Sequence, residues 1–382
     1  MRKIVVGLSG GVDSSAAIIL LKRQGWSPIG VSLIFPAWEN ECNEKRENAC
    51  CTDESFSNAR LVCEKLGVPY HTFDCRRTFQ KEVIDYFTSE LAAGRTPNPC
   101  SFCNWKVKFK MLLRWAGKHK IKHVATGHYA KITGGEGRQT AAGDAATKAG
   151  RQANSLSLKN SAVLQLVRPK DEKKDQTYGL ALLPNKWLKR MVFPLADYNK
   201  QDVYDIAIKG GFDFYRKIPQ SQDLCFVSGK AMGRFLSEKI GEKRGPILEY
   251  ETGKELGRHD GIFRFTIGQR RGLRFPFMYF VKEFDTKRNA VIVTKDRQKL
   301  LRKGMMVGHF NYISSAPLAR GIRAFIQIHP HQKELPATVE PKSSRTLAIH
   351  LDAPLDGIAP GQICAIYKSG VCLGGGTIEK AI

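Results

Sequence analysis

The sequence predicts an α/β protein with a Rossmann-like parallel sheet, a small middle module and a C-terminal β-barrel. Two observations lead to this prediction. Up to about residue 212, short apolar runs alternate with helical segments, which is typical of a parallel sheet covered by helices on both faces. Beyond that point, short strands separated by glycine and proline take over, as in small barrels. We therefore expect domains over residues 1–212, 213–285 and 286–382.

The alternation in the first domain gives the expected elements in order. Strands are expected at residues 3–8, 28–34, 69–73 and 122–126, and helices at 14–24, 56–66 and 78–91. Residues 134–160 are rich in Gly, Ala, Lys and Arg without a steady period, so we expect a flexible insertion there. In the C-terminal part, strands are expected at 277–284, 290–294, 321–328, 337–340, 346–351 and 362–366.

The first expected strand runs into a turn of small residues that opens a helix. The turn consists of Gly7, Leu8, Ser9, Gly10, Gly11, Val12, Asp13 and Ser14. Its glycines allow backbone N–H groups to face an anion, its serines add hydroxyl donors, and the positive end of the helix points at the same place. The turn matches neither Gly-x-x-x-x-Gly-Lys-Ser/Thr nor Gly-x-Gly-x-x-Gly. It is similar to the pyrophosphate loop of enzymes that cleave ATP to AMP and pyrophosphate; an ordinary Gly/Ser turn is the alternative.

Asp13 indicates which chemistry the loop serves. A carboxylate beside bound phosphates is repelled unless a cation lies between them, so we interpret Asp13 as a ligand of a bridging Mg²⁺.

Charge and cysteine usage narrow the class of protein. The chain has 61 Lys and Arg against 36 Asp and Glu, a net charge of +25, which favours a polyanionic partner such as nucleic acid over a merely basic surface. We find no apolar stretch long enough to cross a membrane and no signal peptide, so we expect a cytoplasmic protein without a membrane partner. The ten cysteines then indicate reduced thiols, metal or cluster ligands, or catalytic groups rather than disulfides.

Three cysteines form a candidate constellation. Cys100 and Cys103 make a Cys-x-x-Cys in a proline-rich loop, and Cys225 lies far downstream in Ser-Gln-Asp-Leu-Cys-Phe. One thiolate can act as a nucleophile while another carries sulfur. Alternatively, the three thiolates can hold a four-iron cluster with one open iron. A zinc site completed by histidine, or a plain redox pair, is the simpler alternative.

Taken together, the motifs resemble the bacterial tRNA 2-thiouridylase (MnmA) family. The resemblance is carried by residues 7–17, 50–51, 94–104, 107–109, 126–130, 174–176, 221–226, 257–261, 266–273, 360–362 and 374–376. Members of this family install sulfur at position 2 of the wobble uridine in certain tRNAs. The resemblance implies a fold of the adenine nucleotide α-hydrolase type, the use of ATP and Mg²⁺, and tRNA and a sulfur donor protein or sulfide source as partners.

The resemblance also implies roles for single residues. Cys103 corresponds to the family's nucleophile and Cys225 to its persulfide-bearing cysteine. ATP contacts are implied at Gly7 through Ser14, Leu33 and Gly127, target-base contacts at Asn98, Pro99 and Cys100, and tRNA contacts at His128, Lys174, Asp175, Gln176 and Gln362. Many members carry Asp where this chain has Cys100. A [4Fe-4S] cluster on Cys100, Cys103 and Cys225 therefore competes with the persulfide and transient-disulfide route, to which we give slight preference.

The implied reaction begins when the uridine O2, a poor leaving group, attacks the α-phosphate of ATP and releases pyrophosphate. Sulfur then displaces AMP from a base that has flipped out of its stack. One alternative is another ATP pyrophosphatase, such as an amidotransferase-type synthetase or an argininosuccinate-like ligase, but the two cysteine motifs and the lack of a glutaminase region oppose it. A non-catalytic RNA-binding module is opposed by the presence of Asp13, Cys103 and Cys225.

Overall fold

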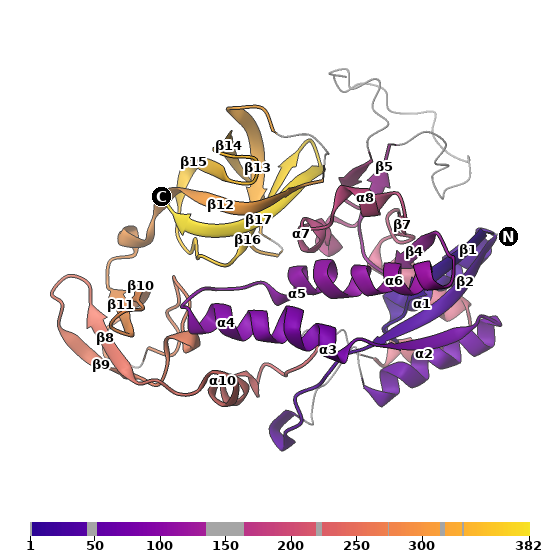
Figure 1. Cartoon of the computed structure of the whole chain (residues 1–382), viewed down its shortest axis with the longest axis horizontal. Coiled ribbons are helices and arrows are strands. Elements are labelled where there is room, and N and C mark those ends of the chain that lie inside the picture. The colour runs from indigo at the N-terminus through magenta and orange to yellow at the C-terminus, as the bar shows by residue number, and fades with distance from the viewer. Residues whose placement is uncertain are drawn as a thin grey trace.

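The computed structural model describes residues 2–43, 52–134, 164–218, 224–273, 275–313, 318–330 and 332–382. An α/β domain occupies one end of the molecule, a small sheet occupies the other, and a barrel lies above the long helices that connect them (Figure 1). Most of the insertion expected at 134–160 falls outside the described residues, as do Cys50, Cys51 and residues 221–223.

The N-terminal domain is built on a five-stranded sheet in the order β3-β2-β1-β4-β7, and every pairing in it is parallel. Its strands are β1 (Arg2–Gly7), β2 (Trp26–Ile34), β3 (Tyr70–Asp74), β4 (His123–Thr126) and β7 (Met191–Val192). Gly7 at the end of β1 lies opposite Val31 of β2 and Thr126 of β4. The expected Rossmann-like sheet is confirmed, and its carboxyl ends meet where such sheets bind ligands.

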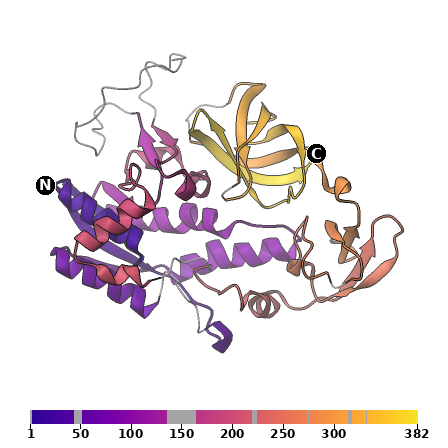
Figure 2. The same cartoon turned by 180° about the vertical axis from the view of Figure 1, so that it is seen from behind.

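Helices cover both faces of this sheet. Ile4 and Val6 of β1 pack with α1 (Val12–Arg23), α2 (Asp53–Leu66) and α9 (Lys200–Lys209). Val5 points the other way, into a core shared with α6 (Lys110–Lys118). This alternation follows from the two-residue period of a strand. Figure 2 shows the same layers from behind.

Two of the longer helices contain a π-helical stretch. The helix expected at 78–91 consists of α3 (Arg76–Phe79), a π-helical stretch (Gln80–Asp85) and α4 (Tyr86–Ala92). The next begins as α5 (Pro99–Phe102), passes through a π-helical stretch (Cys103–Phe109) and continues as α6. Short helices α7 (Thr177–Leu180), α8 (Asn185–Leu188) and α10 (Met232–Ile240) complete this part.

The middle part of the chain forms a four-stranded sheet in the order β10-β11-β8-β9. Its strands are β8 (Gly245–Glu249), β9 (Glu255–His259), β10 (Phe280–Asp285) and β11 (Ala290–Thr294). Its core contains Ile247, Val281, Val291 and Val293. The strands β8 and β9 were not expected from the sequence.

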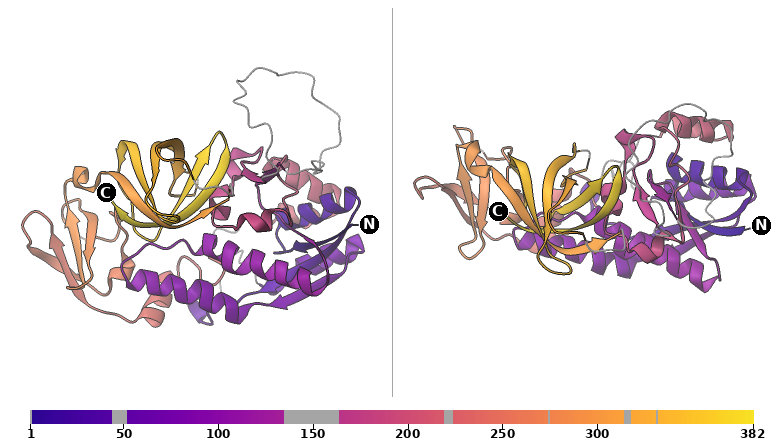
Figure 3. Two further views of the ribbon diagram at one scale, coloured as in Figure 1. Left: turned by 45° about the horizontal axis from the view of Figure 1, so that its top comes forward. Right: turned by 90° about the horizontal axis from the view of Figure 1, so that it is seen from above.

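The C-terminal strands close into a six-stranded antiparallel barrel, β12-β15-β14-β13-β16-β17, through a pairing between β12 and β17. They are β12 (Arg302–Tyr312), β13 (Ile322–Gln327), β14 (Leu335–Pro341), β15 (Leu347–Leu355), β16 (Ile363–Lys368) and β17 (Val371–Ala381). The expected barrel is confirmed, and the two additional views of Figure 3 show it beside the helices of the N-terminal domain.

A hairpin of the N-terminal domain extends the barrel sheet. It consists of β5 (Lys131–Thr133) and β6 (Gln165–Val167). Val167 and Leu166 of β6 pair with Val371 and Cys372 of β17. Backbone hydrogen bonds therefore join the two domains. Among the described helices, none combines the length and apolar character that a membrane crossing requires.

Candidate active site

A cavity of about 1300 Å³ lies at the carboxyl ends of β1, β2 and β4. Eighteen of the residues singled out in the sequence line it: Gly7, Leu8, Ser9, Gly10, Gly11, Val12, Asp13, Ser14, Leu33, Asn98, Pro99, Cys100, Gly127, His128, Lys174, Asp175, Gln176 and Gln362. Cys103 and Cys225 are not among the lining residues. The topology thus brings together segments from the N-terminal domain and the barrel.

The loop after β1 is braced by its own short side chains. The Ser14 hydroxyl donates to the Gly11 carbonyl at 2.9 Å and accepts from the Ser9 N–H at 3.2 Å. Gly10 has a φ of +77°, and a Cβ there would lie 2.1 Å from the Ser55 carbonyl oxygen, so only glycine fits. A Cβ on Gly11 would meet nothing nearer than the Ser9 hydroxyl at 3.6 Å. The loop therefore packs closely against α2 at Gly10, whereas space remains beside Gly11 at the start of α1.

The start of α1 has the properties of an anion site. The helix begins at Val12 after Gly11, and no side chain caps it there. Its first N–H groups and its positive dipole end therefore face the cavity, an arrangement that suits phosphate. Tyr215 also stabilises the loop, because its hydroxyl donates a hydrogen bond to the Gly10 carbonyl at 3.1 Å.

Asp13 is held by two residues that the sequence did not single out. The Tyr129 hydroxyl donates to Asp13 Oδ1 at 2.9 Å, and Lys200 Nζ lies 2.6 Å from the same oxygen. Burial, followed by the negative charge of Asp13, raises the pKa of Tyr129 well above its usual range. The Asp13 side chain is still 37% exposed, so the carboxylate remains accessible from the cavity.

Asp13 fits a magnesium ion that is shared with phosphates. Within the described ranges, no three Cys, His, Asp or Glu side chains are grouped so that they can hold a metal ion by themselves. Mg²⁺ commonly binds through one or two carboxylates together with substrate phosphates and waters. One accessible carboxylate beside a phosphate loop meets that requirement.

Cys100 and Cys103 lie on consecutive turns of one helix but in different surroundings. Asn98 caps α5 by accepting a hydrogen bond from the Ser101 N–H at 3.0 Å, and Pro99 occupies the first helical position. Cys100 faces the cavity and is exposed to it, whereas Cys103 is 4% exposed and packs in the core. The π-helical stretch starts at Cys103, and such stretches are frequent at functional sites.

Cys225 lies beside the cavity that Cys100 lines, although the two are far apart in the sequence. It occupies a tight turn closed by a bridge between Leu224 and Val227, and Leu224 lines the cavity together with Cys100. Although Cys100 is exposed to the cavity, desolvation of its thiol by the surrounding protein raises its pKa; the negative charge of Cys225 raises this pKa further, while the charge of Lys108 lowers it. The segments that carry the two cysteine motifs therefore border one cavity.

Cys100, Cys103 and Cys225 are the kind of residue that ligates an iron-sulfur cluster. Thiolates are the usual ligands of such clusters, and Cys100 and Cys103 are separated by about one helical turn. In the part of the chain that the structure covers, however, these cysteines and the histidines are not grouped so that they can hold a metal ion. This observation applies to a cluster and to a zinc site completed by histidine alike.

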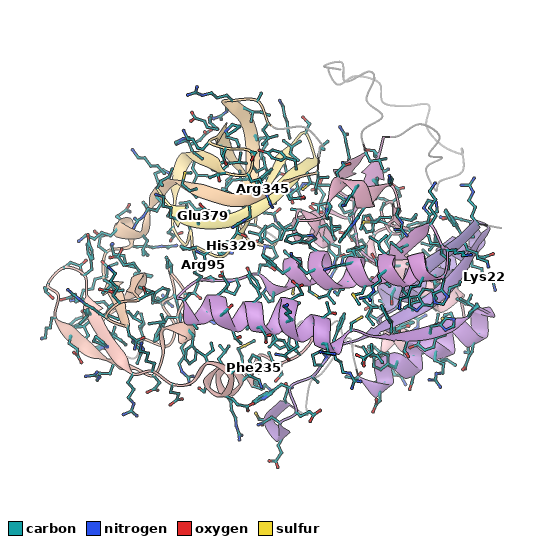
Figure 4. All side chains as sticks on the ribbon, in the orientation of Figure 1. Lys22, Arg95, Phe235, His329, Arg345 and Glu379 are labelled. Carbon is teal, nitrogen blue, oxygen red and sulfur yellow. The ribbon has the colours of Figure 1, made fainter. Side chains whose placement is uncertain are left out.

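The barrel supplies the wall opposite the helices. Gly361 has a φ of +95°, and a Cβ there would lie 2.9 Å from the backbone nitrogen of Thr96. The Thr96 N–H donates to the Pro360 carbonyl at 2.7 Å, and Gln362 Nε2 lies 3.3 Å from His329 Nδ1. Figure 4 shows His329 below the barrel, on the side of the helices.

His128 is a neutral residue of this site. Its Nδ1 is hydrogen-bonded to the Thr126 hydroxyl at 2.8 Å, and its ring centroid lies 5.4 Å from that of Phe109. Burial, and to a smaller extent the charge of Lys108, lowers the pKa of His128 to about 3. At neutral pH it can therefore stack or form hydrogen bonds, but it does not form an ion pair with a phosphate.

Asp175 and Gln176 are already engaged within the protein. Asp175 forms an ion pair with Arg168 and accepts the Thr177 N–H at 2.9 Å. Gln176 accepts the Tyr129 N–H at 2.8 Å through Oε1. Both residues therefore brace the cavity wall, whereas Lys174 beside them lines the cavity with a cationic side chain.

Comparison with known proteins identifies the family. Residues 2–229 match a family model described as a tRNA methyl transferase HUP domain, residues 233–295 its PRC-barrel domain, and residues 302–378 an aminomethyltransferase β-barrel domain. A tRNA-specific 2-thiouridylase MnmA of Roseiflexus sp. (strain RS-1) is 38% identical, with the whole of both chains covered. The MnmA of Aquifex aeolicus is 36% identical, with 100% of this chain and 99% of the relative covered. The chain belongs to the MnmA family.

The names of the family and of its members differ in the group that is transferred. The family models are named for methyl transfer, whereas the full-length MnmA relatives are named for thiolation. The solved structure of a 4-thiouridine synthetase in complex with RNA and ATP shares 13% identity, and the match covers 63% of this chain and 50% of that one, with a TM-score of 0.34. That likeness is too low to add to the assignment.

In this member of the MnmA family, several cavity residues have no local signal in the sequence. Lys200, Tyr129 and Tyr215 contact the loop at residues 7–14 from distant segments, and the charge of Lys108 lowers the pKa values of Cys100 and His128. Tyr129 directly follows the expected Gly127-His128 turn in the sequence. This adjacency was the one indication in the sequence that Tyr129 lies near the loop at residues 7–14.

Proposed function

We propose that this protein uses ATP to replace the O2 atom of the wobble uridine in tRNA with sulfur. One observation supports this proposal most directly: a single cavity joins the phosphate loop at residues 7–14 to Cys100 and to Leu224, the chain neighbour of Cys225. Activation takes place at the uridine O2 and sulfur transfer at C2, the carbon bonded to it, so both reagents need to reach the same carbonyl group. A cavity with a phosphate-binding loop at one end and thiols at the other meets that need.

The first step is activation of the base. The uridine O2 attacks the α-phosphorus of ATP, an O–P bond forms, and the bond to pyrophosphate breaks. The N–H groups at the start of α1 and the Lys200 ammonium stabilise the charge that develops on the departing pyrophosphate. Asp13 would hold Mg²⁺, which when bound neutralises phosphate charge.

The second step transfers sulfur from a persulfide on Cys225. The outer sulfur attacks C2 of the uridine, and the C2–O2 bond breaks as AMP leaves with the oxygen. The Cys103 thiolate then attacks the inner sulfur of Cys225, and the electron pair of the broken S–S bond stays on the sulfur attached to C2. The products are 2-thiouridine and a Cys103–Cys225 disulfide, which an external dithiol reduces with two electrons. A sulfur donor protein or a sulfide source reloads Cys225.

The cluster route is a second candidate, favoured by the presence of a third thiol, Cys100, in the cavity wall. In this route Cys100, Cys103 and Cys225 would hold a [4Fe-4S] cluster, which when bound supplies an iron with an open coordination position. The activation step and its residues are the same in both routes.

The charge of the cavity favours tRNA as the substrate. Lys108, Lys174, Lys200 and Lys217 line it, and the whole chain carries a net charge of +25. Such a surface attracts a polyanion, and its contribution weakens as salt concentration rises. A base that reaches Cys100 has to leave its stack, as in other enzymes that act on bases.

The test is mass spectrometry of nucleosides from tRNA incubated with anaerobically purified protein, ATP, Mg²⁺ and either sulfide or a persulfide donor. We expect 2-thiouridine together with AMP. A methylated nucleoside instead, or no modified nucleoside from protein that still binds ATP, would overturn the proposal.

Iron content and the visible spectrum of the same preparation distinguish the two routes. Full activity without iron supports the persulfide route. Activity that follows iron content and disappears in Cys100→Ser supports the cluster route.

A further inference from the structure

We propose that Asn43 is a positioning residue whose side chain holds the turn bearing Cys225 beside the cavity that Cys100 lines. This inference rests on the proposed function, because it assigns Asn43 to the sulfur-transfer step. Asn43 ends a short helical turn (Glu41–Asn43) that follows β2, and nothing in its local sequence marks it as functional.

The Asn43 side chain is buried and hydrogen-bonded on both sides of its amide. It is 1% exposed. Its Nδ2 donates to the Trp38 carbonyl at 2.6 Å and to the Phe226 carbonyl at 3.3 Å, and its Oδ1 accepts the Ser228 N–H at 3.0 Å. One side chain thus joins the segment after β2 to both sides of residue 227. A buried amide with three partners restricts both segments strongly, because loss of any partner leaves a buried polar group unsatisfied.

Trp38 reinforces the same junction. Its N–H donates to the Phe226 carbonyl at 3.1 Å, and its indole Nε1 donates to Glu238 Oε1 at 3.0 Å. The rings of Trp38 and Phe226 both contact Phe235, with centroids 5.6 Å and 5.4 Å apart. Figure 4 shows Phe235 on α10, below α4. The Phe226 carbonyl is therefore fixed by two donors while its ring is fixed in an aromatic cluster.

We call the hydrogen bonds from Asn43 and Trp38 to Phe226 and Ser228 the Asn43 clamp. They position Cys225 through the backbone. Cys225 directly precedes Phe226 in the turn closed by Leu224 and Val227, and this turn lies outside the sheets and helices. The buried side chains of Phe226 and Val227 and the hydrogen bonds at Phe226 and Ser228 attach it to the core. Cys225 is partly buried, and its chain neighbour Leu224 lines the cavity together with Cys100. Release of the clamp lets Cys225 move away from Cys100, and a displacement of about 1 Å can cost about 100-fold in rate.

The experiment compares Asn43→Ala with the unchanged protein in two independent assays. The first measures the S-alkylation rate of Cys225 relative to Cys100 by peptide mass spectrometry, without tRNA. The second measures kcat and KM for tRNA thiolation and the release of pyrophosphate in the first turnover. We expect relative Cys225 alkylation to rise at least about threefold and kcat to fall about 10- to 100-fold. We expect KM for tRNA and pyrophosphate release to change less than about twofold, because the nucleotide end is untouched.

Asn289→Ala is the matched control. Asn289 is also buried, and its Nδ2 donates to the carbonyls of Lys243 and Arg244 at 3.0 Å each, but it lies in the middle module. Equal effects of the two variants on thiolation, or unchanged Cys225 alkylation in Asn43→Ala, would overturn the inference. If Asn43→Ala does not fold, Asn43→Asp keeps the volume and the acceptor for the Ser228 N–H while removing both amide donors, and the same expectations apply to it.

The alkylation assay also separates this inference from the proposed function. An unchanged protein that makes no 2-thiouridine refutes the function, while the alkylation ratio still tests the clamp. An active protein with an unaltered ratio in the Asn43 variants refutes the clamp alone.

Discussion

The two ends of the cavity are built in different ways. At one end, which we call the nucleotide end because ATP is proposed to bind there, residues 7–14 form one continuous loop. Its internal hydrogen bonds join Ser9, Gly11 and Ser14, which are close in the sequence. At the other end, which we call the sulfur end, Cys100 and Cys225 come from distant segments, and the barrel contributes Gln362. Hydrogen bonds within the loop maintain the first end, with added contacts from the distant residues Tyr129, Lys200 and Tyr215, whereas the second end depends mainly on long-range packing. A substitution at one end is therefore expected to impair the step proposed for that end and to leave the step at the other end unchanged. The end with Cys100 and Cys225 is expected to be the more sensitive to substitutions made far from it.

The largest difference between the effects on thiolation and on ATP binding is expected from Cys225→Ser. The substitution removes the sulfur carrier, or one cluster ligand, and leaves the nucleotide loop unchanged, so thiolation should be abolished while ATP binding is retained. Nucleoside mass spectrometry and equilibrium binding of ATP measure the two effects. Retained thiolation would contradict either role of Cys225.

The reverse separation is expected from Asp13→Asn. Loss of the carboxylate removes the Mg²⁺ ligand and the partner of Lys200, so pyrophosphate release should fall by about 100- to 1,000-fold, the range found for single groups that stabilise transition-state charge. The alkylation rate of Cys225 should not change, because the sulfur end is intact. A coupled pyrophosphate assay provides the measurement, and an unaltered rate would rule out the metal-ligand role.

A smaller effect is expected at the contact between the barrel and the N-terminal domain. Gly361→Ala places a Cβ 2.9 Å from the Thr96 nitrogen at a φ of +95°, which should lower stability by at least about 1–2 kcal/mol and thiolation by about tenfold. Gly357→Ala is the control, because Gly357 also has a positive φ, +73°, but a Cβ there meets nothing within 4 Å. Thermal unfolding and kcat of both variants give the test. Equal losses in the two would assign the effect to backbone strain alone.

The smallest effect concerns pH and stability. The pKa of His128 is lowered to about 3 in the folded protein, while an unfolded histidine titrates near pH 6.5. As pH falls below about 6.5, protons bind preferentially to the unfolded chain, so this residue lowers the free energy of unfolding by about 1–2 kcal/mol at about pH 5. His128→Asn should lose less stability than the unchanged protein between about pH 8 and pH 5 in urea unfolding. The same pH dependence in both proteins would show that His128 does not titrate in this way.

The sequence predicted best what depends on local patterns. The parallel sheet and the loop at residues 7–14 follow from short apolar runs and from a glycine-serine turn, because strand, turn and helix are adjacent there. The predicted alternation held for β1 to β4. The bounds expected for the helix at 78–91 are close to the observed bounds, Arg76 and Ala92, but its π-helical stretch at Gln80–Asp85 has no simple sequence pattern.

Features that depend on distant contacts were not predicted. The hairpin β5–β6 is short, its two strands are separated by residues 134–164, and it is stabilised by pairing with β17. Lys200 and Tyr215 reach the nucleotide loop only because α9 and the segment after it pack on α1. Asn43 needed the folded structure for the same reason. The roles of Cys103 and of the implied tRNA contacts stay predictions.

The pairing of β6 with β17 has a mechanical consequence. Paired strands do not slide past each other without moving every side chain to the opposite face of the sheet. The two residue pairs between β6 and β17 therefore fix how the hairpin of the N-terminal domain is joined to the barrel. Under the proposed function, this main-chain contact helps to keep the barrel wall at a constant separation from the loop at residues 7–14 whatever side chains occupy the surface.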